Sequence, residues 1–380
     1  MKISQFAKSI LPLWRFHLAR SRLPRLYELI RNERSSTIAN QLPLMDQVWS
    51  WRRGFLSKSY VDYDFKHNDY QYYLSDYARF VRTWEINGRY REILADKLLF
   101  SLTMKMFEDL VPRTHGIVLK GRVHWLRQDS PLRFGELWPA IADYCRSGLG
   151  LVLKPIRGGS GAGLFFLLWK TGKLVMNGNP YGRKEFTKHI TQLNDYLIED
   201  LIVQAPYSAE IFADSSNTIR LLTMWDIETG EPFIAATEHR FGTKTSAPVD
   251  NWDRGGVSSG INLETGMLGP CIRYGQDGQL VWHERHPDSG ALIAGVYIPG
   301  WIEIKKKIVE VSTALPFLPY IGWDVLVDSN GGSKIIEGNH RPGVHGLQLH
   351  TPLLRDFRIR RFYEQYGVIH PVRESKKMNM

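Results

Sequence analysis

Apolar residues recur along the chain in short runs whose spacing changes between that of helices and that of strands. Helical spacing predicts helices at 5–33, 74–83, 95–110, 134–147, 185–196 and 301–313. Short runs bounded by turn residues predict strands at 151–154, 164–169, 198–204, 217–226, 232–238, 321–328 and 334–338. The two kinds of element do not alternate regularly, so the pattern predicts an α+β fold.

The last two predicted strands have the pattern of a β-hairpin over residues 322–339. Asn330-Gly331 is a strong hairpin signal, and a two-residue turn there places Asp324 opposite Glu337. Asn339 then shares the face of Glu337, and a turn one residue later brings it opposite Asp324 instead. Opposed acids repel each other, so the hairpin predicts a cation, and oxygen ligands favour Mg²⁺ shared with phosphate. The alternative is an exposed hairpin with acids on its wet face.

A glycine-rich segment lies between two predicted strands, and Lys154 ends the first of them. We call this segment, residues 158–163, the flap; it reads Gly158, Gly159, Ser160, Gly161, Ala162, Gly163. It is not a Walker A loop, where the lysine follows the glycines, and it lacks the last glycine of the dinucleotide fingerprint. The chain also lacks the catalytic loop and metal-binding motifs of protein kinases. Backbone N–H groups of a flap and a strand lysine suit a triphosphate, whereas a glycine turn without ligand is the alternative.

Together these motifs resemble the ATP-grasp superfamily and, within it, the sugar-transfer-associated ATP-grasp family. Further strings match that family in order: Asn87-Gly88, Asp96 to Phe100, Leu197 to Ile202, Asn217 to Arg220 with Thr223, Gly255 to Val257, and Asp324 to Gly343. The resemblance covers about residues 85–352. It implies an ATP-grasp fold that holds a nucleotide between two α+β lobes. The expected parts are a basic, mostly helical region at 1–84, lobes at 85–198 and 199–352, and a C-terminal tail at 353–380.

The resemblance also implies roles for individual residues. Lys97 and Lys154 are expected to hold the α and β phosphates while the flap closes over them. The adenine frame is Glu199, Asp200, Leu201 and Ile202, and the ligands of one or two Mg²⁺ are Asp324, Glu337 and Asn339. Arg220 is the candidate for stabilising charge on the transferred group, and Arg341 is a second candidate. A surface salt bridge for Arg220 and a capping contact for Arg341 are the structural alternatives.

The implied activity is an ATP-dependent carboxylate-amine ligase that works through an acyl phosphate. Its partners are then a small-molecule carboxylate and an amine acceptor, with a sugar-linked acceptor suggested by the family's association with sugar transfer. Phosphoryl transfer without ligation is one alternative. A membrane-recruited binding protein with a degenerate nucleotide site is the other.

Positive charge is concentrated at the start of the chain. Residues 1–60 hold 11 Lys and Arg against three acids, a balance of +8, while the whole chain is +10. The nearly neutral remainder argues against a nucleic-acid groove. Residues 1–34 have the composition of a basic amphipathic helix, which predicts either peripheral attachment to an anionic membrane or a helix packed on the body.

Two cysteines, Cys145 and Cys271, imply no disulfide framework, so we expect a cytoplasmic protein, with the inner membrane face as the alternative location. The oligomeric state is left open by the sequence.

Overall fold

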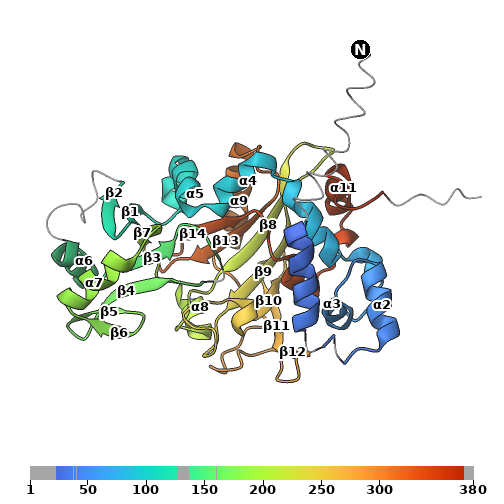
Figure 1. Ribbon diagram of the computed structural model, residues 1–380, viewed down its shortest axis with the longest axis horizontal. Helices are drawn as coiled ribbons and strands as arrows, with labels where there is room; N and C mark the ends of the chain where they lie inside the picture. The colour runs from blue at the N-terminus through green and yellow to red at the C-terminus, as the bar shows by residue number, and fades with distance from the viewer. Residues whose placement is uncertain (1–22, 37, 40, 127–136, 160, 372–380) are drawn as a thin grey trace, which may run out of the picture.

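Two seven-stranded sheets, antiparallel throughout, form the body of the protein in the computed structural model (Figure 1). The structure describes residues 23–36, 38–39, 41–126, 137–159 and 161–371. In Figure 1 the first sheet lies at the left and the second in the middle, with α2 and α3 at the right. The expected α+β fold is confirmed.

The first sheet has the strand order β2-β1-β7-β3-β4-β5-β6. Its strands are β1 (Thr114–Leu119), β2 (Arg122–Trp125), β3 (Leu151–Pro155), β4 (Phe165–Lys170), β5 (Lys173–Met176), β6 (Asn179–Tyr181) and β7 (Tyr196–Asp200). Helices α6 (Leu137–Arg146) and α7 (Arg183–Gln192) pack against it through one apolar core. The flap is the connection between the paired strands β3 and β4, as predicted.

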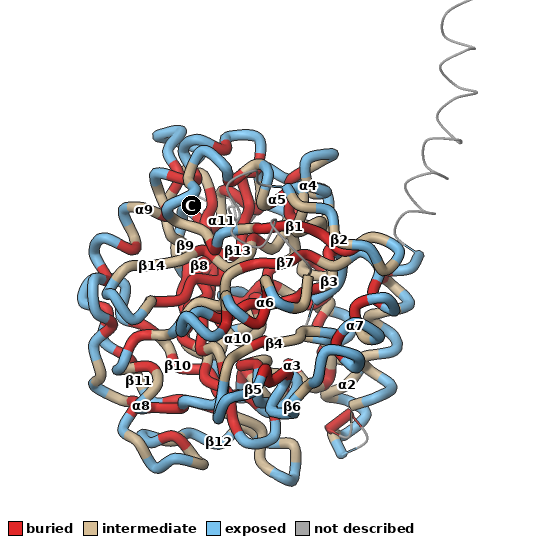
Figure 2. Tube along the Cα trace, turned by 90° about the vertical axis from the view of Figure 1, so that its left-hand side faces the viewer, coloured by how far each residue is buried: buried red, intermediate tan, exposed pale blue. Residues whose placement is uncertain are grey.

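The second sheet has the order β12-β11-β10-β9-β8-β13-β14. Its strands are β8 (Ile219–Trp225), β9 (Pro232–Phe241), β10 (Val257–Ile261), β11 (Leu268–Tyr274), β12 (Leu280–His283), β13 (Ile321–Val327) and β14 (Ser333–Asn339). Two separate apolar cores involve this sheet: one includes α9 (Trp301–Ala314), and the other α10 (Val344–His350) and α11 (Phe357–Gln365). Figure 2 shows buried chain along the strands and exposed chain in the outer loops.

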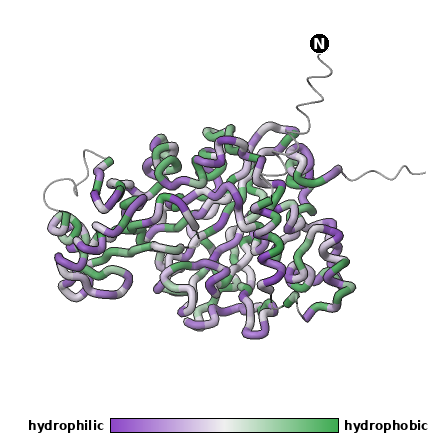
Figure 3. Tube along the Cα trace, in the orientation of Figure 1, coloured by the Kyte–Doolittle hydropathy of each residue, from purple (hydrophilic) through white to green (hydrophobic). Residues whose placement is uncertain are grey.

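The remaining elements are short. They are a helix at 23–35, α2 (Leu44–Arg52), α3 (Ser57–Asp62), α4 (Arg91–Ala95), α5 (Lys97–Thr103), α8 (Pro206–Ile211), and 3₁₀ or π turns at Tyr70–Tyr72, Ala78–Arg82, Thr83–Glu85, Gly88–Tyr90, Met104–Leu110, Trp252–Arg254 and Leu353–Arg355. Five buried aromatic side chains form one apolar cluster within residues 55–73: Phe55, Tyr60, Tyr63, Phe65 and Tyr73. No helix in the described ranges has the length and apolar character to cross a membrane, and Figure 3 shows hydrophilic stretches throughout the body.

Two expected boundaries are wrong. Residues 353–368 are not a tail, because Leu353, Phe362, Tyr363 and Val368 belong to the buried core beside α10. Their spacing is amphipathic, and the buried half of α11 completes that core. The division at 198/199 would cut β7, whose pairing with β1 and β3 continues to its end. The predicted helix at 5–33 is helical from 23 to 35, and residues 1–22 and 372–380 lie outside the described residues.

Candidate nucleotide and metal site

The β13–β14 hairpin brings the predicted metal ligands together, although its turn is not the predicted one. The chain turns over Asp328–Gly331, where the Gly331 N–H donates to the Asp328 carbonyl at 3.0 Å and Gly331 has φ +79°. The Asp328 carboxylate accepts from two backbone N–H groups of this loop, which favours this turn over a two-residue Asn330-Gly331 turn. A register shift beyond Asp324 restores the pairing, so Asp324 does lie opposite Glu337.

A row of charged side chains crosses four neighbouring strands. Glu337 on β14 pairs with Asp324 on β13, Asp324 pairs with Arg220 on β8, and Arg220 pairs with Glu238 on β9. Directly opposed residues in antiparallel strands point to the same face of the sheet. The row therefore places three carboxylates and a guanidinium side by side, and all four side chains line one cavity.

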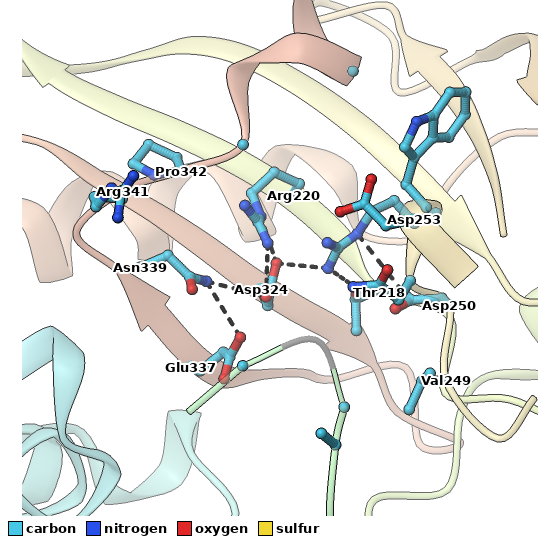
Figure 4. Close-up of a pocket in the computed structure, with 18 of the residues that line it drawn as sticks. Thr218, Arg220, Val249, Asp250, Asp253, Asp324, Glu337, Asn339, Arg341 and Pro342 are labelled. Atoms are coloured by element: carbon cyan, nitrogen blue, oxygen red, sulfur yellow. Dashed lines mark hydrogen bonds and ion pairs between the residues drawn. The ribbon is translucent and has the colours of Figure 1, made fainter. Parts of the chain in front are cut away.

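Asp324 is the most heavily bonded member of this row (Figure 4). Its Oδ1 accepts from Arg220 Nε at 2.6 Å and from Arg240 Nη2 at 2.8 Å, and its Oδ2 accepts from Arg220 Nη2 at 3.0 Å. Burial raises the pKa of the Asp324 carboxyl, but the two guanidinium groups outweigh it and hold the pKa well below its usual value. Arg220 is thus a buried partner of Asp324 and not a surface salt bridge.

Glu337 and Asn339 complete the predicted ligand set. Asn339 Nδ2 donates to Asp324 Oδ2 at 3.2 Å and to Glu337 Oε1 at 3.4 Å. Burial, and then the charge of Asp324, raise the pKa of Glu337 above its usual value. In the part of the chain that the structure describes, no three His, Cys, Asp or Glu side chains gather as a metal cage. Two carboxylates and an amide oxygen nevertheless fit Mg²⁺, which binds through one or two carboxylates plus nucleotide phosphates.

Lys154 lies at the interface of the two sheets. It and Glu199 are diagonal neighbours on the paired strands β3 and β7, and its Nζ lies 2.5 Å from Glu199 Oε2. The same ammonium donates to the carbonyl of Ile336 on β14 at 3.4 Å. Both charged side chains are about 7% exposed, so the pair is buried. A buried ammonium beside the acids of β14 is well placed to contact a bound phosphate.

Lys97 joins the start of the flap to Glu337, one of the predicted metal ligands. Its Nζ donates to the Gly158 carbonyl at 2.7 Å and lies 3.7 Å from Glu337 Oε2. It is the first residue of α5, and Asp96 caps that helix by accepting from two of its backbone N–H groups. Asp96 also binds Arg157 at 3.2 Å, so the start of α5 is fastened to the residue before the flap.

The flap reaches across to the second lobe. The backbone φ angles of Gly158, Gly161 and Gly163 are +114°, +67° and +74°, values that residues other than glycine rarely adopt. A Cβ on Gly161 would lie 2.6 Å from Cγ1 of Val249, so the glycine permits a close approach. Gly158, Gly159 and Gly161 line the cavity, while Ser160 lies outside the described residues.

The predicted adenine frame separates into two kinds of residue. Glu199 is occupied by Lys154, and Asp200 Oδ1 accepts from the Tyr144 hydroxyl at 2.5 Å and lies 2.7 Å from His115 Nε2. Leu201 and Ile202 line the cavity and leave apolar surface for a base. Of the predicted adenine frame, these two side chains and the backbone are therefore the groups left without a charged partner inside the described part of the protein.

One cavity of about 1200 Å³ collects most of the predicted residues. It is lined by Lys97, Lys154, Gly158, Gly159, Gly161, Glu199, Asp200, Leu201, Ile202, Arg220, Asp324, Glu337, Asn339 and Arg341; Gly163 is not among them. Arg341 binds Glu28 of the 23–35 helix at 3.0 Å, which is an ion pair and not the alternative capping contact.

Sequence reasoning missed a second layer of the site around Arg240. Its Nη2 donates to Thr218 Oγ1 at 2.6 Å, and Thr218 donates through its hydroxyl and its backbone N–H to Asp250 at 2.6 and 2.7 Å. Burial raises the pKa of the Asp250 carboxyl, against the influence of Arg240. Arg240 lies two residues beyond Glu238 on β9, so the period of two in strands was the available signal.

Comparisons with known proteins agree with this geometry. The family model described as Sugar-transfer associated ATP-grasp matches residues 78–356. A comparison with curated proteins found no match.

Among solved structures, an L-amino acid ligase from Bacillus licheniformis is 13% identical over 67% of this chain and 42% of that chain, with a TM-score of 0.35. A D-alanine-D-alanine ligase from Coxiella burnetii is 13% identical over 72% and 59%, with a TM-score of 0.35. The ATP-grasp ligase PsnB, complexed with minimal precursor, is 12% identical over 74% and 64%, with a TM-score of 0.38. The chain thus covers less than two thirds of each of these solved chains, and likenesses this weak carry no information on its reaction.

Proposed function

The chain belongs to the sugar-transfer-associated ATP-grasp family, and from this membership we propose that it is an ATP-dependent ligase. It would activate a carboxylate as an acyl phosphate and join it to an amine or a similar nucleophile, with a sugar-linked acceptor as the proposed setting. The observation that carries the proposal is the convergence of two lysines, a glycine flap and the acids of one hairpin on a single cavity.

The proposed reaction has two balanced steps. A carboxylate oxygen of the first substrate attacks the γ-phosphorus of ATP, the bond from that phosphorus to the β-phosphate oxygen breaks, and ADP leaves. The amine nitrogen of the second substrate then attacks the acyl carbon, inorganic phosphate leaves with the carbon–oxygen electron pair, and the amine gives its proton to solvent. Such chemistry depends on positioning and on neutralising phosphate charge more than on a strong base.

The residues of the cavity divide this work. Lys154 and Lys97 are proposed to contact phosphate oxygens as the flap covers them with backbone N–H groups. Leu201 and Ile202 are proposed to bound the adenine. Asp324, Glu337 and Asn339 would hold Mg²⁺, which when bound supplies charge neutralisation between the β and γ phosphates.

Arg220 has a narrower proposed role than the sequence indicated. It holds Asp324 through two hydrogen bonds of 2.6 and 3.0 Å, so its first function is to fix the orientation of that carboxylate. Arg240 donates at 2.8 Å to Asp324 Oδ1, the oxygen that also accepts from Arg220 Nε. Together they orient a metal ligand, and they add positive charge beside the site of the transferred phosphoryl group.

The test is the dependence of ADP release on substrates. The protein is incubated with ATP, Mg²⁺ and a library of amino acids and uronic acids, and the products are read by mass spectrometry. A ligase releases ADP and phosphate only when both a carboxylate and an amine are present, and it forms a product lighter than their sum by one water. A phosphorylated product without ligation would identify a phosphotransferase instead. No turnover with any pair, despite ATP binding, would favour the degenerate binding protein.

A further inference from the structure

The cavity has a second wall that the family match does not include. Residues 28–76 contribute Glu28, Arg31, Asn32, Ser35, Ser36, Ile38, Leu56, Lys58, Ser59 and Asp76 to the lining, whereas the match begins at residue 78. We call these residues the N-terminal wall. Figure 1 shows the helices of this region on the side of β8 and β9 away from the first sheet, which carries the flap. A cavity of about 1200 Å³ exceeds the usual range for one small ligand, so it has room beside the nucleotide.

Buried contacts hold the segment that carries this wall against α10 and β11. Asp62 Oδ2 lies 2.9 Å from His345 Nε2 and accepts from the Tyr274 hydroxyl at 2.8 Å, while His345 Nδ1 lies 2.9 Å from the Tyr63 hydroxyl. The Asp62 side chain is fully buried. Further along, the side chain of Gln348 accepts from the backbone of Leu74 at 2.6 Å. The wall is thus fixed to α10 and β11, and its side chains face the cavity from a defined position.

The acids of this wall have partners within the protein, whereas two of its basic residues have no acidic partner among the residues that the structure describes. Its two acids are occupied: Glu28 binds Arg341 at 3.0 Å, and Asp76 lies 3.2 Å from the guanidinium of Arg79 and also accepts from the backbone of Leu56. Within the described ranges, Arg31 and Lys58 have no carboxylate partner. The Lys58 Nζ lies 3.8 Å from the centre of the Tyr274 ring, and both residues line the cavity. At this wall the uncompensated charge is positive.

We propose that the N-terminal wall binds the acceptor substrate, and that this acceptor carries an anionic group contacted by Arg31 and Lys58. The inference rests on the proposed function, since it assigns the part of the cavity left beside the nucleotide. Guanidinium and ammonium groups recognise carboxylate and phosphate through charge-assisted hydrogen bonds, so these two anions form the ligand class. Arg31 and Lys58 then determine which acceptor the enzyme takes, while the nucleotide is held by residues of the matched family region.

The experiment measures binding of three sugar probes to the full-length protein by isothermal titration calorimetry. The probes are glucuronic acid, glucose 1-phosphate and uncharged glucose, each added at saturating Mg²⁺ and a non-hydrolysable ATP analogue. We expect at least one of the two anionic probes to bind, and glucose to bind at least about tenfold more weakly. Arg31→Ala and Lys58→Ala should each weaken the anionic probe about tenfold and leave nucleotide affinity unchanged.

Matched controls come from the same segments. Arg34 is exposed on the helix that carries Arg31, and Lys66 is exposed shortly after α3; neither lines the cavity. Arg34→Ala and Lys66→Ala should leave probe affinity unchanged. Four outcomes would overturn the inference. Glucose could bind as tightly as glucuronic acid, or neither anionic probe could bind. The Arg31 and Lys58 variants could keep full affinity for the anionic probe, or the control variants could lose as much affinity as they do. Failure of the wild type to bind the nucleotide would overturn the proposed function instead, and it is read from a separate titration.

Discussion

Around the proposed nucleotide site, four cationic side chains are each paired with an acid of the protein. Lys154 is paired with Glu199, Lys97 lies beside Glu337, and Asp324 holds the guanidinium groups of Arg220 and Arg240. A triphosphate carries negative charge and Mg²⁺ carries positive charge. When they bind, the basic side chains must give up contacts with these acids for contacts with phosphate, and the acids must do the same for Mg²⁺. Removing a single member therefore affects both stability and binding, and the variants must be chosen to separate the two effects.

The first prediction concerns the buried pair of Lys154 and Glu199. Lys154→Ala should lower ATP affinity much more than adenosine affinity, because an ammonium contacts phosphate and not base. It should also lower the free energy of unfolding by about 3–5 kcal/mol, since the buried Glu199 carboxylate loses its cationic partner and keeps only the Thr114 hydroxyl, 3.1 Å away. The double variant Lys154→Met/Glu199→Gln should regain stability but not ATP affinity. Denaturant titration and calorimetry measure the two effects, and equal losses for ATP and adenosine in the double variant would contradict the phosphate role.

The second prediction concerns Asp324, which the hairpin alone presents as a crowded acid whose removal should relieve repulsion. The structure reverses that expectation, because Arg220 loses its carboxylate partner and Arg240 keeps only Asp250, 3.8 Å away, as an acidic partner. Asp324→Asn should abolish Mg²⁺-dependent turnover and lower the free energy of unfolding by about 3–5 kcal/mol. The folded-state pKa of Asp324 is lowered, so its contribution is present above the unfolded pKa of about 3.9 and is lost as pH falls toward the folded value. The difference in melting temperature between the two proteins should therefore stay constant from pH 8 to about pH 4 and begin to shrink below that; melting curves that coincide at pH 8 would refute the buried pairing.

The third prediction concerns Glu337, whose replacement should change stability in the opposite direction to that of Asp324. Its folded-state pKa is raised, so its ionisation opposes folding, and this penalty grows as pH rises from the unfolded pKa of about 4.3 through the folded value. Glu337→Gln should raise the free energy of unfolding by up to about 1 kcal/mol at pH 8 without Mg²⁺, and the gain should vanish near pH 4. Turnover with ATP and Mg²⁺ should be lost. Near-normal turnover in saturating Mg²⁺ would show that Glu337 is not a ligand.

At the scale of elements, the hairpin shows what a sequence can predict. The period of two in strands placed Glu337 and Asn339 on one face, and that period survived because one buried face fixes the register of a strand. The turn could not be predicted from Asn330-Gly331, because the side chain of Asp328 binds the loop and a bulge corrects the register. Strands such as β1, β10 and β11 were missed, since their short runs gain strand character only from pairing partners distant in sequence.

The fourth prediction tests the flap as an element. Gly161→Ala combines a positive φ with a Cβ only 2.6 Å from Val249, so the flap must shift away from the second lobe. The Michaelis constant for ATP should rise about tenfold, which corresponds to the 1–2 kcal/mol cost of a left-handed residue plus the clash. Gly172→Ala is the control, since its φ is +76° with nothing within 4 Å. Adding Val249→Ala to Gly161→Ala should restore part of the ATP affinity; no restoration would show that the contact with Val249 does not set the flap position.

At the scale of the whole molecule, the N-terminal region had two interpretations that the sequence could not separate. A basic amphipathic pattern suits a membrane surface and a packed helix alike, because both bury the apolar face. For residues 23–35 the structure shows packing: Arg25 is buried with its guanidinium 3.8 Å from the centre of the Trp84 ring, Glu28 binds Arg341, and Glu33 binds the backbone of Ser57 at 2.9 Å. These contacts join segments far apart in sequence, which local patterns do not reveal.

The last prediction therefore concerns residues 1–22, which hold five Lys and Arg and no acid. Each basic residue near an anionic leaflet adds about 1 kcal/mol of attraction, and the effect fades with salt. The full-length protein should co-sediment with vesicles containing phosphatidylserine at low salt, and less so at high salt or with neutral vesicles. Deleting residues 1–22 should abolish co-sedimentation without lowering the melting temperature, whereas deleting 1–35 should lower it because the contacts of Arg25, Glu28 and Glu33 are lost. A full-length protein that stays in the supernatant at low salt would end the membrane hypothesis. If co-sedimentation persists after residues 1–22 are deleted, a surface other than this segment binds the membrane.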